Sequence, residues 1–409
     1  MNPNTIKHLD RFAGIPVCFV LTVYDRLKAL FVGGATSQNE RPRNILFIKL
    51  IEQGASVLAY PAFKKAQELA GPANLYFCVF KENRPIMDVL GVIPAENIFE
   101  IRRDSIGVFL GDLLRFFLWA RRIGIDATVD MEFFSRASAI IAYLTGARRR
   151  VGYHRFTSEL PYRGRLMTHN IQYNPYLHVA HAYLLSVEAL VSDMDEIPMP
   201  KTLYQERELP LPQFVPTNGE RARIEAFFSG KNGRPRILIN PNAGDMLPLR
   251  KWSPEKFGEL TARILTSYED ATIVITGAPS EASAAEHLRR KAGSDRVVNL
   301  AGKTSLRELM ALYCASDALI TNDSGPGHFA AMTPLRTIVL FGPETPELFG
   351  PLGGNVHIVR IPLACSPCVS VLNHRFSPCT RNRCMELISV AAVFGTLQKV
   401  LAGTGSARR

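Results

Sequence analysis

The residues best suited to chemistry lie in one short stretch, Asn322-Asp323-Ser324-Gly325-Pro326-Gly327-His328. It follows the apolar run 318–321 and precedes Phe329-Ala330-Ala331-Met332. A strand that ends in an acid, two glycines and a histidine, and then opens a helix, can hold a phosphorylated ligand. The glycines let backbone N–H groups approach an anion, and a helix N-terminus carries partial positive charge. The same pattern also suits a plain strand-to-helix turn that needs glycine for its backbone angles.

Three more strand-like runs end in the same way and place this stretch in a sheet. Residues 236–240 end in Pro241-Asn242-Ala243-Gly244, residues 271–276 in Gly277-Ala278-Pro279, and residues 337–341 in Gly342-Pro343-Glu344-Thr345-Pro346. Helical patterns separate the runs. The pattern predicts an open parallel α/β sheet, whose ligands bind outside the carboxyl ends of the strands. We therefore expect Asn242 and Gly277 to lie near Asp323 at a ligand site.

Length and charge narrow the class of protein. A chain of 409 residues, 47% of them hydrophobic, exceeds what one core usually supports, so two domains are expected. The net charge of +11 indicates anionic partners. The chain has no run of Lys and Arg interleaved with aromatic residues and no zinc-finger helix, so we expect no nucleic-acid partner. A membrane surface with phosphorylated lipid, or a nucleotide-bearing substrate, fits the charge.

The first 35 residues contain an apolar stretch, Ile15 to Val23, followed by Asp25, Arg26 and Lys28. No segment has about 18 consecutive apolar residues, so a transmembrane helix is not expected. The charges disfavour a signal peptide. The interpretation for residues 1–35 is an amphipathic helix that either lies on a membrane surface or packs on the protein. With it we expect a cytoplasmic protein, peripheral to the inner face of the cytoplasmic membrane.

Two α/β regions follow. Strands are expected at 44–48, 75–80 and 127–131, and helices at 56–70 and 110–122, which gives a first domain over 44–200. Residues 201–233 are rich in Pro, Glu and Gly and predict a linker with a lead-in helix. Strand and helix patterns then alternate again over a second domain, 234–409. A last helix is expected at about 386–401, and the sequence leaves open whether it crosses back to the first domain.

The order of motifs resembles glycosyltransferase family 9, the lipopolysaccharide heptosyltransferase family. The resemblance runs from about residue 44 to the C-terminus. The matching pieces are residues 125–130, 144–152, 249–254, 302–306, 322–328 and 341–343. The resemblance implies the GT-B fold, in which two Rossmann-like α/β/α domains with parallel sheets face an interdomain cleft. The first domain would then bind the acceptor and the second a nucleotide-sugar donor.

The resemblance also implies an activity. Family members transfer heptose or a related sugar, with inversion, from a nucleotide diphosphate sugar to a lipopolysaccharide core-type acceptor, and need no cofactor for catalysis. ADP-heptose is the expected donor. By the family pattern Asp323 would contact the sugar hydroxyls. The residues expected near the diphosphate are Ser324, Gly325, Gly327 and His328, with Arg250 and Lys251 as side-chain cations. Taken by themselves, Arg250 and Lys251 also suit a solvated basic pair.

The general base is where the chain departs from the family. The usual Gly-Asp pair after the first strand is here Gly54-Ala55, and alanine accepts no proton. Glu52 in the same loop is the nearest carboxylate and the candidate replacement, although an exposed loop glutamate without a task has the same sequence. Asp130, or Glu132, is the second candidate. An acid at 130 also suits a cap of the helix expected near Ser135.

Basic residues follow in the first domain and suit an anionic, lipid-linked glycan acceptor; they are Arg148, Arg149, Arg150, His154 and Arg155. A solvated helix end explains them equally well. Two rival functions remain open. One is a GT-B-like nucleotide-sugar epimerase, and the other is a non-catalytic sugar-nucleotide or glycan-binding homologue, which Ala55 favours.

Four of the seven cysteines cluster within residues 365–384, at Cys365, Cys368, Cys379 and Cys384. The spacing suits one structural zinc or an iron–sulfur centre, with His374 as a spare ligand. Disulfides or reduced thiols are the alternatives, and a cytoplasmic location disfavours stable disulfides. Cys18, Cys78 and Cys314 lie in apolar contexts and are expected in cores.

Overall fold

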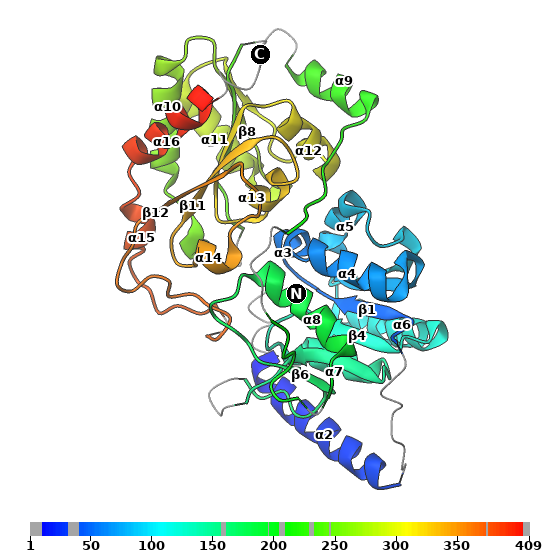
Figure 1. Ribbon diagram of the computed structural model, residues 1–409. Helices are drawn as coiled ribbons and strands as arrows, with labels where there is room; N and C mark the ends of the chain where they lie inside the picture. Colours follow the sequence, from blue (N-terminus) through cyan, green and yellow to red (C-terminus); the bar gives the residue numbers. More distant parts are fainter. Residues whose placement is uncertain are drawn as a thin grey trace. The chain divides into compact units, whose positions relative to one another are not determined.

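The computed structural model describes residues 10–31, 41–156, 161–194, 196–203, 209–228, 233–244, 247–373 and 375–403. The chain forms two compact units that divide between Pro210 and Leu211. Each unit contains one sheet flanked by helices (Figure 1). The division falls within the expected linker, and the lead-in helix is α9 (Asn218–Phe227).

The first sheet has six strands in the order β3-β2-β1-β4-β5-β6, and every neighbouring pair is parallel. The strands are β1 (Ile45–Ile48), β2 (Leu75–Phe80), β3 (Ile98–Ile101), β4 (Ala127–Asp130), β5 (Arg149–Tyr153) and β6 (His169–Ile171). Every residue of β1 and β4 is buried, as expected of central strands covered on both faces. This is why β1 has the continuous apolar sequence Ile-Leu-Phe-Ile.

Helices cover both faces of the first sheet (Figure 1). They are α2 (Gly14–Phe31), α3 (Gln53–Leu58), α4 (Tyr60–Ala70), α5 (Arg84–Leu90), α6 (Ile106–Ile123), α7 (Arg136–Leu144) and α8 (Val179–Glu188). The 3₁₀ turns are η1 (Pro72–Asn74), η2 (Lys81–Asn83), η3 (Ala95–Asn97) and η4 (Ala189–Val191). One apolar cluster joins α2, α6 and α7 to the sheet through Cys18, Phe116 and Ala139. Helices α4 and α8 pack on each other.

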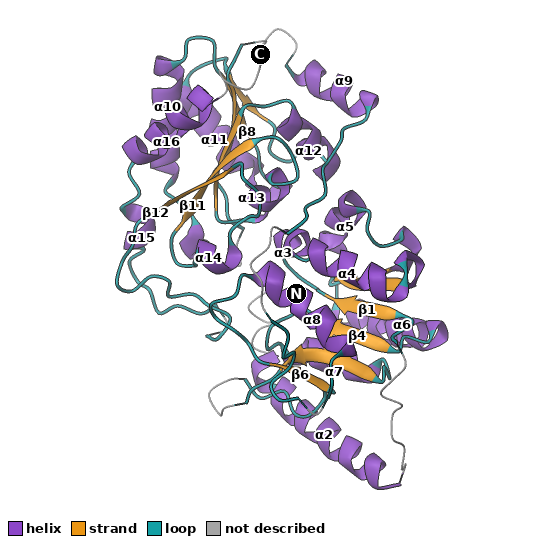
Figure 2. Cartoon of the chain, in the orientation of Figure 1, coloured by secondary structure: helices purple, strands orange, loops and turns teal. Residues whose placement is uncertain are grey.

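The second sheet also has six parallel strands, in the order β12-β11-β10-β7-β8-β9. Figure 2 draws the strands of both sheets in orange between purple helices. The strands are β7 (Arg236–Asn240), β8 (Thr272–Ile275), β9 (Val297–Asn299), β10 (Ala318–Asn322), β11 (Arg336–Phe341) and β12 (Val356–Arg360). The remaining helices are α10 (Pro254–Ser267), α11 (Ala282–Ala292), α12 (Leu306–Cys314), α13 (Gly325–Ala330), α14 (Pro346–Phe349), α15 (Arg383–Glu386) and α16 (Val390–Ala402). The 3₁₀ turns are η5 (Pro248–Arg250) and η6 (Pro279–Glu281).

Both sheets follow one strand order, which is third-second-first-fourth-fifth-sixth when each unit is counted from its own first strand. This is the order of the doubly wound dinucleotide-binding fold. In that fold the connections run in opposite directions from the first and the fourth strand, which leaves a crevice at their carboxyl ends. The crevices expected here lie between β1 and β4 and between β7 and β10. The α/β fold class with two Rossmann-like sheets is confirmed.

Two predicted helices differ from their expected bounds in the structure. The helix expected at 56–70 is divided into α3 and α4 at Ala59, because Pro61 near the start of α4 has no N–H to continue the hydrogen bonds of α3. The last helix, expected at about 386–401, is α16, which begins later at Val390; Ser389 caps it by accepting a hydrogen bond from the Ala392 N–H. Helix α16 packs in the core of the second unit through Phe394 and its apolar neighbours.

The N-terminal helix α2 packs on the first unit along one narrow face. Gly14, Cys18 and Thr22, spaced four residues apart, are its buried residues. Just before it, Asp10 caps α7, because its Oδ1 accepts hydrogen bonds from the N–H groups of Arg136 (2.9 Å) and Ala137 (2.7 Å). Among the described residues, no helix is both long and apolar enough to cross a membrane. The rest of the expected N-terminal segment, residues 1–9 and 32–35, lies outside the described residues.

Candidate functional site

The strongest candidate site lies at the crevice of the second sheet. In the register of the sheet Thr321 of β10 pairs with Asn240 of β7, and Asn322 pairs with Leu340 of β11. The loops that follow these three strands therefore begin at the same edge. They are the loops that contain Asn242 and Arg250, Asp323 to His328, and Glu344. The structure thus brings together most of the residues expected to bind a donor.

Asn322 fixes the loops around this edge. Its Oδ1 accepts a hydrogen bond from the Trp252 N–H at 3.0 Å. Its Nδ2 donates to the carbonyl oxygen of Pro241 at 2.9 Å and more weakly to that of Asn242 at 3.4 Å. The side chain is fully buried, so these bonds form away from water, where a lost partner is costly. One asparagine at the end of β10 therefore sets the path of the chain after β7.

Trp252 secures the same loop from the other side. Its ring is buried in the core of the second unit and lies edge-on to Phe257, with ring centroids 4.9 Å apart. Its Nε1–H donates to the carbonyl oxygen of Ile388 at 3.0 Å. Arg250 and Lys251 immediately precede this fixed residue, so their backbone is held at the crevice. Neither is a fully solvated cation, since both are half-buried.

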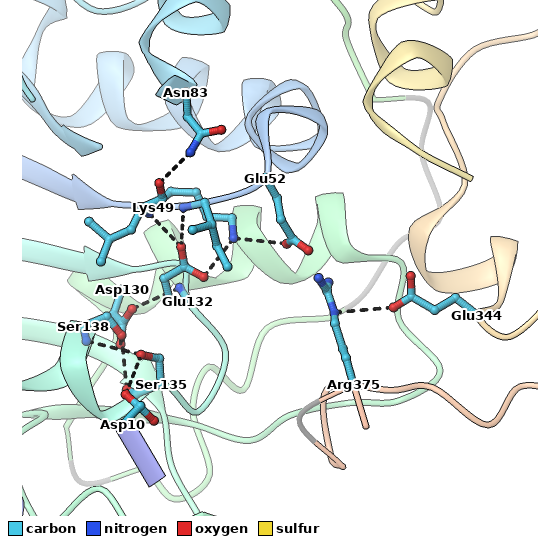
Figure 3. A network of polar contacts seen from close by, with 12 residues as sticks. Asp10, Lys49, Glu52, Asn83, Asp130, Glu132, Ser135, Ser138, Glu344 and Arg375 are labelled. Carbon is cyan, nitrogen blue, oxygen red and sulfur yellow. Dashed lines mark hydrogen bonds and ion pairs between the residues drawn. The ribbon is translucent and has the colours of Figure 1, made fainter. Parts of the chain in front are cut away.

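Two buried carboxyl groups face the Arg250 guanidinium. Its Nη1 lies 3.5 Å from Asp323 Oδ2 and 3.2 Å from Glu344 Oε2. A second arginine, Arg375, approaches Glu344 from the Cys-rich segment, with Nε 3.4 Å from Oε1 (Figure 3). Asp323 and Glu344 are only 3% exposed. The arrangement is a compact buried network of two acids and two arginines.

Burial shifts the protonation of the two acids. It raises the pKa of Glu344 to about 8, and the negative charge of neighbouring Asp323 adds to this. Burial also raises the pKa of Asp323, whereas the charge of Arg250 and a hydrogen bond from Glu344 lower it. The proton therefore resides on Glu344 near neutral pH, and Asp323 is the carboxylate of the pair.

Buried donors remain unused at the same edge. Within the described residues, Arg250 Nε and Asn242 Nδ2 are buried and have no hydrogen-bond acceptor. Buried donors in native structures are nearly always satisfied, so such atoms call for an explanation. A guanidinium and an amide that both offer N–H groups at a sheet crevice suit an anionic, oxygen-rich ligand such as a diphosphate. The chemistry expected from the sequence fits these atoms.

The glycine-containing turn lies where the sequence predicts it. Ser324 is extended and precedes α13, which begins at Gly325. A Cβ on Gly327 would approach Val339 and Pro351 to 3.3 Å, so this glycine allows α13 to pack closely on β11. His328 is buried within α13. Gly277 follows β8, and a Cβ there would lie 3.0 Å from Asn242 Nδ2, which places Gly277 beside the unused amide.

The first sheet has its own polar cluster at the crevice between β1 and β4. Ile48 pairs with Asp130, so the loop 49–52 begins beside the segment 130–132. Glu132 Oε1 accepts hydrogen bonds from the N–H groups of Leu50 (2.7 Å) and Ile51 (3.0 Å). Its Oε2 binds buried Lys49 Nζ at 2.9 Å (Figure 3). Glu132 therefore acts as the support of the loop after β1.

Glu52 stands at the end of this supported loop. Its Oε2 lies 3.4 Å from Lys49 Nζ, and its side chain is 20% exposed. Its backbone is left-handed, with φ 70°, an uncommon conformation for a residue other than glycine. It directly precedes α3, and Ala55 lies in the first turn of that helix. The candidate base is thus the partly exposed carboxylate of the cluster, and its role stays a prediction.

Asp130, the second candidate base, is fully buried at the end of β4. Its Oδ2 binds Arg163 Nη2 at 2.6 Å. Oδ2 also accepts a hydrogen bond from Ser138 Oγ at 3.0 Å, and Oδ1 accepts the Glu132 N–H (Figure 3). Burial raises its pKa to about 6, against the opposing charge of Arg163. These contacts describe a carboxylate that connects β4 to α7 inside the unit. The cap of α7 comes from Ser135 and Asp10.

Comparison with known proteins identifies the family. The model of glycosyltransferase family 9 (heptosyltransferase) matches residues 124–375, more than half of the chain. The chain belongs to glycosyltransferase family 9. Lipopolysaccharide heptosyltransferase 2 of Salmonella typhimurium is 30% identical over 153 residues, which cover 37% of this chain and 43% of that protein. Lipooligosaccharide heptosyltransferase 2 of Campylobacter jejuni is 28% identical over 174 residues, 42% and 52% of the two chains. The matched stretch spans about half the length of these curated relatives.

Solved structures of family 9 proteins share the fold. The E. coli ADP-heptose lipopolysaccharide heptosyltransferase II has a TM-score of 0.67 at 20% identity, over 89% of this chain and 100% of that one. The E. coli heptosyltransferase WaaC with ADP has a TM-score of 0.60 at 18% identity, over 87% and 99%. At these identities the likeness concerns the fold alone. The predicted GT-B fold is confirmed.

The basic residues expected to bind the family 9 acceptor do not form one group. Arg149 and Arg150 begin β5, whereas His154 and Arg155 follow its end. At about 3.3 Å per residue, roughly 16 Å separate Arg150 from Arg155 along the strand. Arg150 is also engaged inside the unit, because it donates to the carbonyl oxygens of Leu166 and Ala147. Of the set, only His154 and Arg155 lie at the carboxyl edge of the sheet, and Arg148 is exposed at the opposite edge.

Within the described part of residues 365–384, the cysteines do not gather into the expected metal site. All seven cysteines are free, with Cys365 and Cys379 exposed and Cys384 buried. Within the residues that the structure describes, no three His, Cys, Asp or Glu side chains gather as metal ligands. Cys368 Sγ instead lies 3.2 Å from Ser377 Oγ. The proposed spare ligand, His374, lies outside the described residues. The structure therefore does not support the zinc prediction.

Four residues of the two clusters have roles that the sequence did not reveal. Glu344 lies in a loop that the sequence placed beside Asp323, and a carboxylate three residues after the neighbouring strand was an available signal. Glu132 was noted only as an alternative base. Arg163 and Arg375 reach their acids from loops far along the chain, at sequence separations of 33 and 31 residues, and carry no local signal.

Proposed function

We propose that this family 9 chain is an inverting glycosyltransferase that moves heptose, or a related sugar, from a nucleotide diphosphate sugar to a lipopolysaccharide core-type acceptor. ADP-heptose is the expected donor. The curated relatives are named heptosyltransferases, and solved family members with this fold hold ADP or ADP-2-deoxy-2-fluoro heptose. The second unit would bind the donor and the first unit the acceptor. The acceptor is expected to be lipid-linked and the enzyme peripheral to the inner face of the membrane.

The observation that carries this proposal is the pair of unused donors at the crevice of the second sheet. Arg250 Nε and Asn242 Nδ2 are buried N–H groups beside the turn of Asp323. In a nucleotide diphosphate sugar the leaving diphosphate gains negative charge as its bond to the anomeric carbon breaks. Preformed donors in a buried site stabilise that charge without reorganising during the reaction. Asp323, the ionised member of the acid pair, would accept hydrogen bonds from the sugar hydroxyls.

The transfer step then needs a base on the acceptor side. The Glu52 carboxylate would take the proton of the acceptor hydroxyl as its oxygen forms a bond to the anomeric carbon. The bond from that carbon to the diphosphate breaks on the opposite face, and its electron pair leaves with the diphosphate. Attack opposite to the leaving group inverts the configuration. No metal or cofactor enters this step.

Donor turnover with and without acceptor tests the proposal and its rivals. We expect the wild type to release nucleotide diphosphate and form glycosylated acceptor only when acceptor is present. Glu52→Gln should lose at least about 100-fold in turnover, as expected for a general base, while donor affinity stays unchanged. Asp323→Asn should lose donor affinity as well. The matched control is Glu68→Gln, which alters an exposed carboxylate of the first unit, 65% exposed, and should keep full activity.

Other outcomes would contradict parts of the proposal. Full activity of Glu52→Gln would assign the base to another residue. Conversion of the donor sugar without acceptor would indicate an epimerase. Tight donor binding by a wild type that never transfers would indicate a non-catalytic homologue. Calorimetric titration of ADP against UDP identifies the nucleotide base, with tighter binding of ADP expected.

A further inference from the structure

Two helices of the first unit carry apolar side chains into solvent on the same side of the sheet. On α6, Ile106, Leu110, Leu114 and Leu118 follow one another at four-residue spacing and are 57–65% exposed. A helix on a soluble surface normally has polar residues on its outer face. The opposite face of α6 packs on the sheet in the usual way, with Phe116 and Ala120 buried in the core. The outward stripe is thus additional to the core-facing one.

Helix α2 shows the same feature more strongly. Its buried face is limited to Gly14, Cys18 and Thr22. The outward apolar residues of α2 are Ile15, Val17, Phe19, Val20, Val23, Tyr24, Leu27, Leu30 and Phe31, all at least 40% exposed. An exposed apolar surface of this extent marks a binding surface rather than a random scatter.

The two stripes lie on one side of the sheet. Cys18 of α2, Phe116 of α6 and Ala139 of α7 belong to a single apolar cluster against it, with α7 packed on α2 (Figure 1). The outward faces of α2 and α6 therefore both point away from this side of the first unit. We call the two outward faces together the α2/α6 surface.

Charge identifies the occupant of the α2/α6 surface. The cations of the two helices, Arg26, Lys28, Arg115, Arg121 and Arg122, are exposed. Their two acids turn inward. Asp112 is buried against Arg102 at 2.8 Å, and Asp25 accepts a hydrogen bond from Tyr143 Oη at 3.0 Å.

Apolar side chains flanked by five outward cations match the boundary between acyl chains and anionic headgroups. A partner protein would need a complementary acidic rim around an apolar groove. A second copy of this chain would bring like charges together, because its own α2/α6 surface is basic.

We propose that the α2/α6 surface docks the protein on an anionic lipid bilayer, with α6 inserting its stripe beside α2. The proposal rests on the proposed function, in which the enzyme is peripheral to the membrane and its acceptor is lipid-linked, and it adds the surface that makes the contact. Neither helix crosses the bilayer, so both lie in its plane. The first unit would then present its acceptor crevice at a fixed height above the headgroups.

Vesicle sedimentation of the full-length protein tests the proposal. The wild type should bind vesicles of phosphatidylcholine with 30% phosphatidylglycerol, and bind pure phosphatidylcholine at least several-fold less. The double variant Leu110→Glu with Leu114→Glu should lower the partition coefficient at least about tenfold, since each leucine no longer inserts. Val20→Glu with Leu27→Glu on α2 should do the same.

The control is Val191→Glu, which places a single such charge at a 52% exposed valine of η4, beyond α8 and outside the α2/α6 surface. It should bind vesicles as the wild type does. The α6 variant should also keep the melting temperature of the wild type, because both leucines are exposed. If the α6 double variant bound vesicles as well as the wild type does, the proposal would be overturned, because α6 would not contact the bilayer. A wild type that dimerises, with an α6 variant that is monomeric and still binds vesicles, would assign the surface to a second copy instead.

Transfer assays separate this proposal from the proposed function. With a delipidated, soluble acceptor fragment the α6 variant should turn over as fast as the wild type. With acceptor embedded in anionic vesicles its rate should fall in proportion to binding. If the α6 variant lost vesicle binding while the wild type showed no transfer at all, the result would support the docking surface and contradict the proposed activity.

Discussion

Glu132→Ala should destabilise the first unit by about 3–5 kcal/mol, the usual loss when one partner of a buried ion pair is removed. In the wild type Glu132 binds Lys49 Nζ at 2.9 Å and accepts the N–H groups of Leu50 and Ile51. Lys49 is only 2% exposed, and in the variant it would keep Glu52 as a partner, at the longer distance of 3.4 Å. Each freed N–H adds roughly 1–3 kcal/mol if it stays dry. These costs overlap, so they set a range rather than a sum.

Glu132→Gln separates the charge from the hydrogen bonds. The amide oxygen can still accept the two N–H groups, so we expect a loss of about 1–3 kcal/mol. The exposed pair Lys65–Glu68 provides a control, and Glu68→Ala should cost less than about 1 kcal/mol. Both Glu132 variants should also lower turnover, because the loop that positions Glu52 loosens.

Urea unfolding followed by tryptophan fluorescence measures these losses in the correct unit. The chain has two tryptophans, Trp119 in α6 and Trp252 in the second unit. In a Trp252→Phe background the signal comes from Trp119 and reports the first unit. A Glu132→Ala loss no larger than that of Glu68→Ala would refute the view that Glu132 holds the loop.

Further predictions concern other buried contacts. Burial raises the pKa of Glu344 above its value of about 4.5 in the unfolded chain, so the folded state binds the extra proton and wild-type stability should fall as pH rises from about 5 to 8. Glu344→Gln should reduce that slope in urea unfolding, and the part that remains comes from groups such as Asp130, whose pKa burial also raises. Gly164→Ala should lower the free energy of unfolding by about 1–3 kcal/mol, because Gly164 has φ 65° and a Cβ would approach the Cys18 carbonyl oxygen of α2 to 2.8 Å. Gly146 also has a positive φ but open space around it, so Gly146→Ala should lower stability less in the same assay. Asn322→Ala should lower the free energy of unfolding by about 2–4 kcal/mol, because it removes the hydrogen bonds that hold the loop after β7. It should also weaken the binding of ADP measured by calorimetry. Unchanged ADP affinity would contradict the view that this loop shapes the donor site.

The strands were readable from the sequence because central parallel strands must be apolar on both faces. The boundaries expected for residues 75–80 and 236–240 match β2 and β7. The Asp323 turn was readable for a related reason, since strand ends in such sheets meet at one edge. The break at Pro61 was missed because the helical pattern of apolar residues continues through it.

Side-chain networks were harder to predict than strands. No local pattern indicated that Arg375 would reach Glu344, because the path of the Cys-rich segment depends on tertiary packing. The basic residues at 148–155 were grouped because they are close in sequence, but the extended strand β5 lies between the first residues of the group and the last. The zinc expectation rested on spacing alone, and spacing does not make thiol groups converge.

The bond from Asp10 to the start of α7 has a practical consequence for anyone who prepares this protein. An exposed, apolar N-terminal helix is the usual target for truncation when expression yields are poor. Here the residues to be trimmed include Asp10, which caps a helix 126 positions away in the chain, and Cys18, which is buried in the core. A shortened protein would gain solubility on its outer face and expose the inner face of α7. Replacing outward residues of α2 with polar ones, and leaving Asp10, Gly14, Cys18 and Thr22 in place, is the safer route to crystals.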